Sequence, residues 1–282
     1  MPLHVYQSIW GMEQLPWKQA QKWTLEQQLD LIRDAGFDGV SVSFTDAEAA
    51  ERICAGAIAR GLRIQASSFP TTVDELRPVF ATIAAVGREH VDHVNLQPNV
   101  RPRTVAESLP YLRGWHALAD EAGVPLFVET HRDRMTTDLH FTLDLLDAMP
   151  ELRLTADLSH FLVGREFALP VSDADHAAIH EVVRRAGAYH GRVASREQVQ
   201  VQISFPHHRL WVDLFAGWWR EGFRHWRANA AEDEVLTFTT ELGPPYWYAI
   251  TGPDGEELSD RWAEALQLAA LVRGLWEEAS PA

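Results

Sequence analysis

Four ionisable residues of metal-binding type stand at or near the ends of four successive strand-like segments. Glu129 ends PLFVE, Asp157 ends LRLTAD, His190 lies within AYHGRV and Glu241 ends LTFTTE. Three carboxylates and one imidazole form an oxygen-rich site that suits Mn2+, Mg2+ or Co2+ in octahedral geometry, with Zn2+ as the alternative. Carboxylates that face one another repel and raise one another's pKa values, and a divalent cation removes that conflict. A single acid at a strand end is common because strand ends meet water, so the prediction of a metal site rests on all four residues together.

These side chains can meet only if the fold brings the four strand ends to one place. Short apolar runs alternate along the chain with longer amphipathic ones, which predicts eight strands and about eight helices. The predicted strands are His4–Trp10, Gly39–Phe44, Leu62–Ser67, Val91–Leu96, Pro125–Glu129, Leu152–Asp157, Ala188–Ala194 and Val235–Glu241. The predicted helices are Leu25–Ala35, Ala47–Arg60, Val73–Val86, Val105–Ala122, Thr137–Ala148, Ala174–Ala186, Leu210–Ala230 and Leu258–Glu278.

Strict alternation over this length predicts an α/β protein with a single (β/α)8 TIM barrel over residues 1–282. A doubly wound open sheet is the main alternative. The first strand is not followed by G-x-G-x-x-G, and the chain contains no P-loop, which favours the barrel. In a barrel the carboxyl ends of the strands surround one mouth, where the active site lies. The predicted loop 196–208 is long enough to indicate a functional segment.

Composition and charge exclude several classes of function. The chain has 282 residues, with 25 Lys and Arg against 40 Asp and Glu, and a formal net charge of −15. This balance argues against a protein that wraps the nucleic-acid backbone. The single cysteine, Cys54, cannot form an internal disulfide or a cysteine-based metal cluster. The only two lysines, Lys18 and Lys22, leave little room for a Schiff-base mechanism, so carbonyl activation is expected to come from a metal.

Targeting signals are not evident, and we expect a cytoplasmic protein with no membrane and no nucleic-acid partner. The segment Met1–Trp10 lacks the basic and apolar regions of a signal peptide, and no apolar run reaches about 18 residues. Tryptophans recur at helical spacing at Trp211, Trp218, Trp219 and Trp226. They indicate either the buried face of a helix or a subunit contact, so a homodimer remains open.

The motifs at the strand ends resemble the xylose isomerase-like TIM-barrel superfamily. Within it, the closest likeness is to the sugar isomerase/epimerase group, which includes ketose 3-epimerases. The motifs are VETH at 128–131, TADLSH at 155–160, YHGRV at 189–193 and TE at 240–241. The D-x-x-H of Asp157–His160 is the most specific of them, and the others gain weight from their order.

This resemblance implies one divalent metal ion and an enediolate mechanism on a keto sugar or related polyol. Glu129 and Glu241 would lie on opposite faces of the substrate, one removing a proton and the other returning it. His160 and Arg196 would contact substrate oxygens. The implied metal ligands are Glu129, Asp157, His190 and Glu241.

Two further residues are candidates for substrate contact, and one departure from the family keeps a second reaction open. His131 follows the first ligand, and Trp10 ends the first strand, where an aromatic ring can stack on a sugar. Family epimerases carry a second glutamate shortly after the first ligand, whereas Thr130–Met135 contains none, and the segment Gln198–Gln200 is not a feature of the well-known epimerases. The alternative is therefore a metal-dependent lyase or dehydratase that eliminates from a 3-keto sugar or keto-inositol.

Two other functions fit the same barrel less well. A DNA-repair endonuclease would use a cluster of three metals and a basic surface, which the charge of −15 disfavours. A non-catalytic partner subunit or sugar-binding module would not need the ordered ligand set.

Overall fold

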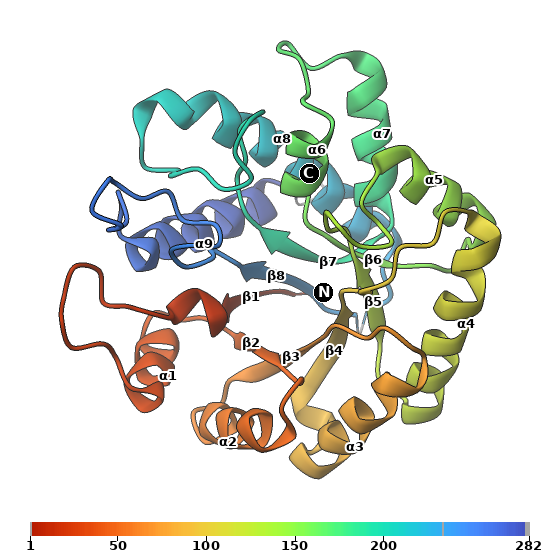
Figure 1. The fold of residues 1–282 in the computed structure, drawn as a ribbon, viewed down its shortest axis with the longest axis horizontal. Coiled ribbons are helices and arrows are strands. Elements are labelled where there is room, and N and C mark those ends of the chain that lie inside the picture. Colours follow the sequence, from red (N-terminus) through yellow and green to blue (C-terminus); the bar gives the residue numbers. More distant parts are fainter. Residues whose placement is uncertain (1, 233, 280–282) are drawn as a thin grey trace.

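The structure, a computed structural model, describes residues 2–232 and 234–279, and its centre is a closed barrel of eight parallel strands (Figure 1). The strands follow one another around the barrel in chain order, and β8 pairs with β1 to close it. The predicted (β/α)8 TIM barrel is therefore confirmed, and the open sheet is excluded. The strands are β1 Leu3–Ser8, β2 Gly39–Ser43, β3 Arg63–Ser68, β4 Val91–Leu96, β5 Leu126–Glu129, β6 Leu154–Ala156, β7 Ala186–Gly191 and β8 Leu236–Thr240.

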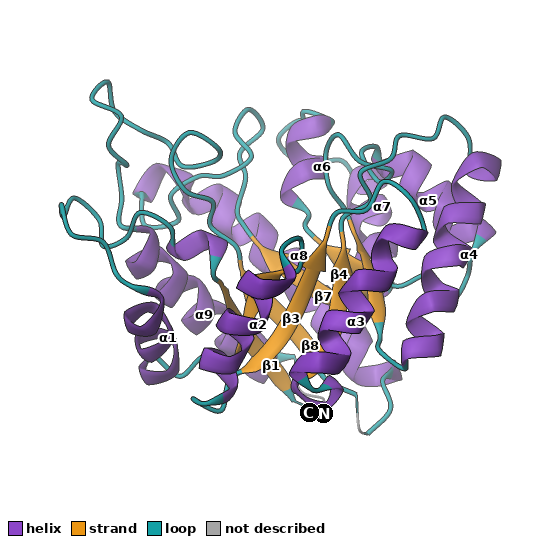
Figure 2. Cartoon of the chain, turned by 60° about the horizontal axis from the view of Figure 1, so that its bottom comes forward, coloured by secondary structure: helices purple, strands orange, loops and turns teal. Residues whose placement is uncertain are grey.

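Helices surround the barrel, and the loops that follow the strands are long and gather at one end (Figure 2). Several helices begin at a residue whose side chain caps the first turn. Thr24 forms a capping box with Gln27, and Asp46 and Asp138 accept hydrogen bonds from backbone amides of the first turn. The helices in the described part of the chain are α1 Leu25–Asp34, α2 Ala47–Ile58, α3 Arg77–Val86, α4 Val105–Ala122, α5 Leu139–Ala148, α6 Ser159–Gly164, α7 Asp173–Arg184, α8 Arg209–Asn229 and α9 Arg261–Glu278.

The tryptophans of α8 belong to the core. Trp218, Trp219 and Trp226 are at most 5% exposed, and the Trp219 ring packs edge-on against Phe238 of β8 at 5.1 Å between centroids. Trp211 is only partly buried. The helix face is thus covered largely by this chain itself, and a homodimer stays a prediction.

The seventh strand differs from the predicted Ala188–Ala194. It starts two residues earlier and ends at Gly191, which pairs with Thr240, the last residue of β8. Residues 192–194 continue past the end of the neighbouring strand and have no ladder to join. A residue pattern records strand propensity but not where the partner strand stops.

One short helix was not predicted, and two helices start three or more residues later than predicted. The short helix α6 was not predicted, because six residues are too few for a helical period to show. Helix α9 starts at Arg261 rather than Leu258, since the Asp260 side chain caps the amides of Trp262 and Ala263. Helix α3 starts at Arg77 rather than Val73, after the 3-10 turn Asp74–Leu76.

The base of the barrel, at the amino ends of the strands, carries a compact polar cluster. Asp92 of β4 accepts hydrogen bonds from the Arg63 guanidinium (Nε–Oδ1 2.6 Å) and from the Tyr6 hydroxyl. Burial by itself raises the pKa of Asp92, but hydrogen bonds from His4, Arg63 and Tyr6 outweigh it and hold the pKa well below its usual value. The cluster therefore joins β1, β3 and β4 through a carboxylate that stays ionised.

None of the helices in residues 2–232 and 234–279 is both long and apolar enough to cross a membrane.

Candidate active site

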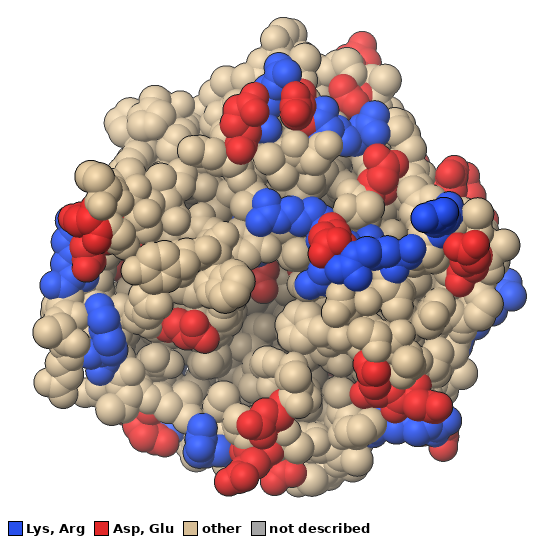
Figure 3. All heavy atoms as spheres, viewed as in Figure 1, with Lys and Arg blue, Asp and Glu red and all other residues tan. Residues whose placement is uncertain are grey.

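A cavity of about 560 Å3 opens at the carboxyl ends of the strands. Figure 3 shows this face of the molecule hollowed at its centre, with acidic atoms visible inside the hollow. Four of the residues that sequence reasoning singled out line the cavity, together with several that it did not. The four are Trp10, Glu129, His131 and Glu241.

Three of the four predicted metal ligands lie together beneath this cavity. Glu129, His190 and Glu241 each offer a ligand atom within 4.8 Å of the others. The His190 Nδ1 atom lies 3.1 Å from Glu241 Oε2 and 3.6 Å from Glu129 Oε1. Backbone pairing brings them together, because the Glu241 amide donates to the carbonyl of Gly191, the residue after His190.

This group suits a cation. Among the described residues His190 Nδ1 makes no well-aligned hydrogen bond, although the side chain is only 1% exposed and Glu241 Oε2 lies 3.1 Å away. The Gln65 amide contacts the other ring nitrogen at 2.8 Å and so orients the imidazole toward the two carboxylates. A divalent ion between two carboxylate oxygens and this nitrogen would satisfy all three groups, provided that Gln65 turns its amide oxygen toward the other ring nitrogen, which then carries the proton.

Amide side chains from the neighbouring strand hold Glu129 in place. Asn95 donates to Oε2 at 2.6 Å, and Gln97 donates to both carboxylate oxygens at 3.1 Å. Burial raises the pKa of Glu129, but the charge and hydrogen bond of His190, with the His131 charge and the Asn95 hydrogen bond, together outweigh burial and hold the pKa well below the usual range. Burial lowers the pKa of His190, whereas Glu241 and Glu129 raise it well above its usual value. A proton on His190 and a metal ion are therefore alternative ways to neutralise the same carboxylates.

The fourth predicted ligand, Asp157, lies beside this group. It is fully buried, and its Oδ1 accepts hydrogen bonds from the Ser159 amide (3.0 Å) and hydroxyl (2.5 Å). Its Oδ2 lies 3.3 Å from Nη2 of Arg192, which also pairs with Glu241 Oε2. Burial raises the pKa of Asp157, although the Arg192 charge opposes this. The guanidinium thus bridges two of the predicted ligands, and direct ligation by Asp157 stays a prediction.

Sequence reasoning missed Arg192, although strand alternation contained the signal. A Cβ atom on Gly191 would lie 2.1 Å from the Phe238 ring, so this position faces the packed side of the strand and must be glycine. His190 and Arg192, one residue to either side, then face the site. The Arg192 guanidinium also lies over the Tyr248 ring, 4.2 Å from its centroid.

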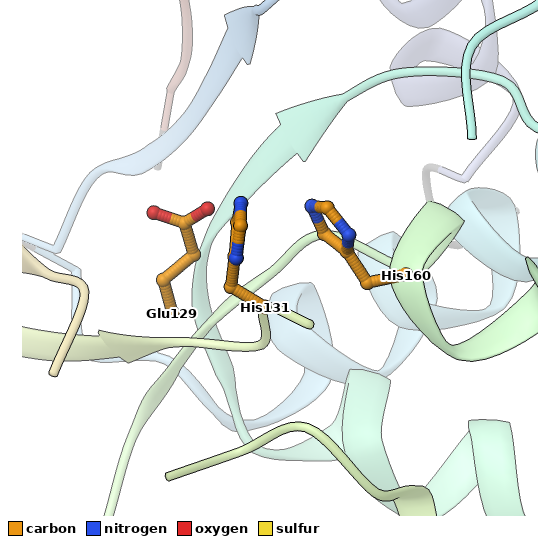
Figure 4. Close-up of side chains that lie close together, drawn as sticks. All are labelled: Glu129, His131 and His160. Atoms are coloured by element: carbon orange, nitrogen blue, oxygen red, sulfur yellow. The ribbon is translucent and has the colours of Figure 1, made fainter. Parts of the chain in front are cut away.

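Two histidines and a tyrosine form a second group on the Glu129 side of the cavity. Nε2 of His131 lies 3.1 Å from the Tyr248 hydroxyl, and Nδ1 lies 2.6 Å from the Arg132 carbonyl oxygen. The His160 ring lies behind His131, with centroids 3.9 Å apart, and Figure 4 shows the two rings beside the Glu129 carboxylate. Burial is the main reason that the pKa of His160 lies well below its usual value, and the charges of His131 and Arg192 lower this pKa further.

The remaining predicted substrate contacts differ in their surroundings. Trp10 lines the cavity and packs edge-on against Tyr248, with centroids 5.5 Å apart. Arg196 lies in the loop after β7, is 44% exposed, and pairs with Glu166 at 3.5 Å and Glu197 at 3.3 Å. Among the described residues, Arg192 lines the cavity and Arg196 does not. Substrate contact by Arg196 stays a prediction.

Asn95, Gln97 and Tyr248 are three further cavity residues that sequence reasoning missed. In the segment VDHVNLQ the polar residues His93, Asn95 and Gln97 alternate with apolar ones, so this side of β4 could have been recognised as facing the site. Tyr248 lies in the loop after β8, and no periodic signal marks it.

Comparisons with known proteins show the fold. No family model matches the chain, and no curated protein sequence matches it. A xylose isomerase-like TIM-barrel protein from Mycobacterium smegmatis, in complex with magnesium, superposes with a TM-score of 0.63 at 11% identity over 98% of both chains. D-Allulose 3-epimerase from Methylomonas sp. gives 0.58 at 14% identity over 99% of this chain and 98% of that chain. The probable 3-DHS dehydratase AsbF of Bacillus anthracis, involved in petrobactin synthesis, gives 0.54 at 14% identity over 96% of this chain and 98% of that chain.

The resemblance that the sequence motifs indicated is therefore confirmed at the level of the fold, which this chain shares with xylose isomerase-like TIM barrels. These structural neighbours include an epimerase and a dehydratase. At 11–14% identity the comparison shows a shared architecture and does not show a shared reaction.

Proposed function

We propose that this chain is a divalent-metal-dependent isomerase or epimerase that acts on a keto sugar or related polyol. The observation that carries this proposal is the group Glu129, His190 and Glu241, in which the buried Nδ1 of His190 faces two carboxylates at the floor of the cavity. A cavity of about 560 Å3 has room for a small polar ligand of this class.

Glu129, His190 and Glu241 would hold the metal ion, and Asp157 would join them if Arg192 turned away from it. Mn2+, Mg2+ and Co2+ fit the oxygen-rich set, and one structure with the same fold is a magnesium complex. When bound, the ion supplies Lewis-acid stabilisation of negative charge on substrate oxygens.

Glu129 and Glu241 are the candidates for proton transfer. Both carboxylates line the cavity and both contact His190, so a substrate above the site would meet each of them. One carboxylate removes the proton from the carbon next to the carbonyl, and the other returns a proton. Asn95 and Gln97 fix the orientation of Glu129 for this step.

Other side chains of the cavity would bind and orient the substrate. Arg192 can donate hydrogen bonds to an oxygen that becomes negative, since its Nη1 has no partner within the described chain. His131 and Tyr248 offer polar atoms on the same wall, and Trp10 offers an apolar face for a sugar ring. Contacts from His160 and Arg196 remain part of the proposal through the family resemblance.

A lyase or dehydratase is the second candidate, and the His131–Tyr248 pair favours it. Elimination needs an acid that protonates the leaving hydroxyl, and these two hydrogen-bonded side chains lie at the cavity next to Glu129. A probable dehydratase is also among the structures with this fold.

Two experiments test the proposal. Metal analysis of purified protein is expected to show a bound divalent ion, and the metal content is expected to fall in Glu241→Gln and in Asp157→Asn; unchanged metal content and activity in both variants would reject the site. NMR in D2O with a panel of ketoses, keto-glycosides and keto-inositols then separates the reactions. Epimerisation exchanges one C–H and keeps every other atom, whereas elimination releases water or an alcohol.

A further inference from the structure

A second set of potential metal ligands lies beside the first and shares Glu129 with it. Glu129, His131 and His160 each place one ligand atom within 4.8 Å of the others. Glu129 and His160 are fully buried, and His131 is 9% exposed. In Figure 4 one nitrogen of each ring lies on the same side as the Glu129 carboxylate oxygens.

His160 supplies the first reason to place a cation here. Neither of its ring nitrogens has a hydrogen-bond partner among the residues that the structure describes. The nearest acidic oxygen, Asp157 Oδ2, lies 3.5 Å from Nε2. A buried imidazole with both nitrogens unpaired is costly and needs a partner that the polypeptide does not provide.

His131 supplies the second reason, because it is held as metal-ligating histidines are held. Its Nδ1 donates to the backbone carbonyl of Arg132 at 2.6 Å, which leaves the lone pair on Nε2. Nε2 lies 3.1 Å from the Tyr248 hydroxyl, whose hydrogen can rotate away from this nitrogen.

Glu129 has the capacity to serve both sets. A carboxylate offers about four lone-pair positions, and Asn95 and Gln97 occupy part of them. Oε1 also faces His190 at 3.6 Å, toward the first set. Because the amides already make three contacts, binding of both ions would displace one of the two 3.1 Å contacts from Gln97.

We infer that Glu129, His131 and His160 form a second divalent-cation site, and that Glu129 bridges it to the Glu129–His190–Glu241 site. Two imidazoles and one carboxylate suit Zn2+ or Co2+ better than Mg2+. The open side faces the cavity, because Glu129 and His131 line it, so water or a substrate oxygen completes the coordination. This inference rests on the proposed function only through the shared ligand Glu129.

Cobalt titration of the whole protein tests the second site. Metal-free protein is prepared by chelation, titrated with Co2+ alone, passed through gel filtration and analysed for bound cobalt. The wild type is expected to retain two equivalents, and the double variant His131→Asn/His160→Asn one. The matched control is His140→Asn, an exposed histidine of α5, which is expected to retain two.

Two further variants separate this inference from the proposed function. His190→Asn is expected to lose the first ion and keep the second, whereas Glu129→Gln loses both. One equivalent in the wild type that His131→Asn/His160→Asn leaves unchanged overturns the second site while the first stands. One equivalent that His190→Asn leaves unchanged but the double variant removes supports the second site and overturns the first.

Anomalous diffraction at the cobalt edge gives a test that does not depend on the folding of variants. Crystals of the cobalt-loaded wild type are expected to show two peaks on either side of the Glu129 carboxylate. A single peak between His190 and Glu241 would overturn the second site.

Discussion

The two ends of the barrel use charged residues in opposite ways. At the base, the Asp92 carboxylate is matched by the Arg63 guanidinium and the Tyr6 hydroxyl, so its oxygens are paired within the chain. At the mouth, the Asp157 and Glu241 carboxylates share the Arg192 guanidinium, Glu129 is held only by amides, and ring nitrogens of His190 and His160 make no well-aligned hydrogen bond within the described residues.

This difference shows which polar groups stabilise the fold and which remain available to bind a ligand. A polar cluster whose groups satisfy one another stabilises the native state and leaves nothing for a ligand. A cluster with surplus negative charge and unpaired nitrogens is complete only when something binds. This matches the division of a TIM barrel into a structural amino end and a reactive carboxyl end.

The largest effect is expected at the mouth. Glu241→Gln should lower kcat by about 10²–10⁴-fold, because the proton-transferring carboxylate is lost. The melting temperature of the metal-free protein should not fall, since one of three repelling carboxylates is removed. Steady-state kinetics measure kcat, and calorimetry on the same preparation measures the melting temperature. A lower melting temperature with a normal kcat would show that Glu241 serves stability and not turnover.

The matching change at the base should affect stability and not turnover. Asp92→Asn leaves the buried Tyr6 hydroxyl and the Arg63 guanidinium without their charged acceptor, at a cost of about 2–3 kcal/mol in the free energy of unfolding. Urea denaturation measures the loss, with the exposed Glu121→Gln as control. The kcat of the folded variant should equal that of the wild type.

The contribution of Asp92 should also depend on pH in one direction. The folded-state pKa lies below the unfolded value of about 4, so the stabilisation is complete above that value and is lost as the pH falls toward the folded pKa. The stability difference between wild type and Asp92→Asn should be constant from pH 5 to 7 and shrink below about pH 4. A difference that grows toward acid pH contradicts the assignment.

Removing the Arg192 guanidinium should make the site at the mouth of the barrel bind metal more tightly. Arg192→Gln takes away a positive charge next to Asp157 and Glu241, so the affinity for a divalent ion should rise about tenfold or more. Isothermal titration with Mn2+ measures this, and the turnover should fall because a donor to the substrate is lost. A lower affinity would show that Arg192 organises the ligands instead of opposing the ion.

The smallest effect is expected from the hydroxyl that contacts His131. Tyr248→Phe keeps the ring under Arg192 and beside Trp10 but removes one hydrogen bond, worth about 1 kcal/mol. We expect a change of roughly five-fold in KM or kcat. A loss of several hundred-fold in kcat would instead mark Tyr248 as the general acid of an elimination.

Much of the fold and part of the site could be predicted from residue patterns. Alternating apolar and amphipathic runs act within a few positions, so they predict eight strands and most helices. The acidic residues at the ends of β5 and β8 followed from the same pattern, and the structure brings them together around His190. The end of β7 and the short helix α6 could not be predicted, since one depends on the length of a partner strand and the other is too short to show a period.

The sequence by itself determined the barrel, the strand ends and the types of side chain that those ends carry, because these depend on local periodicity. Only the tertiary structure decided how the side chains pair across the mouth. It placed Arg192 between Asp157 and Glu241, Asn95 and Gln97 on Glu129, and His131 against His160. Those pairings join residues from different strands and loops, and the distances that set their charge interactions exist only once the barrel has closed.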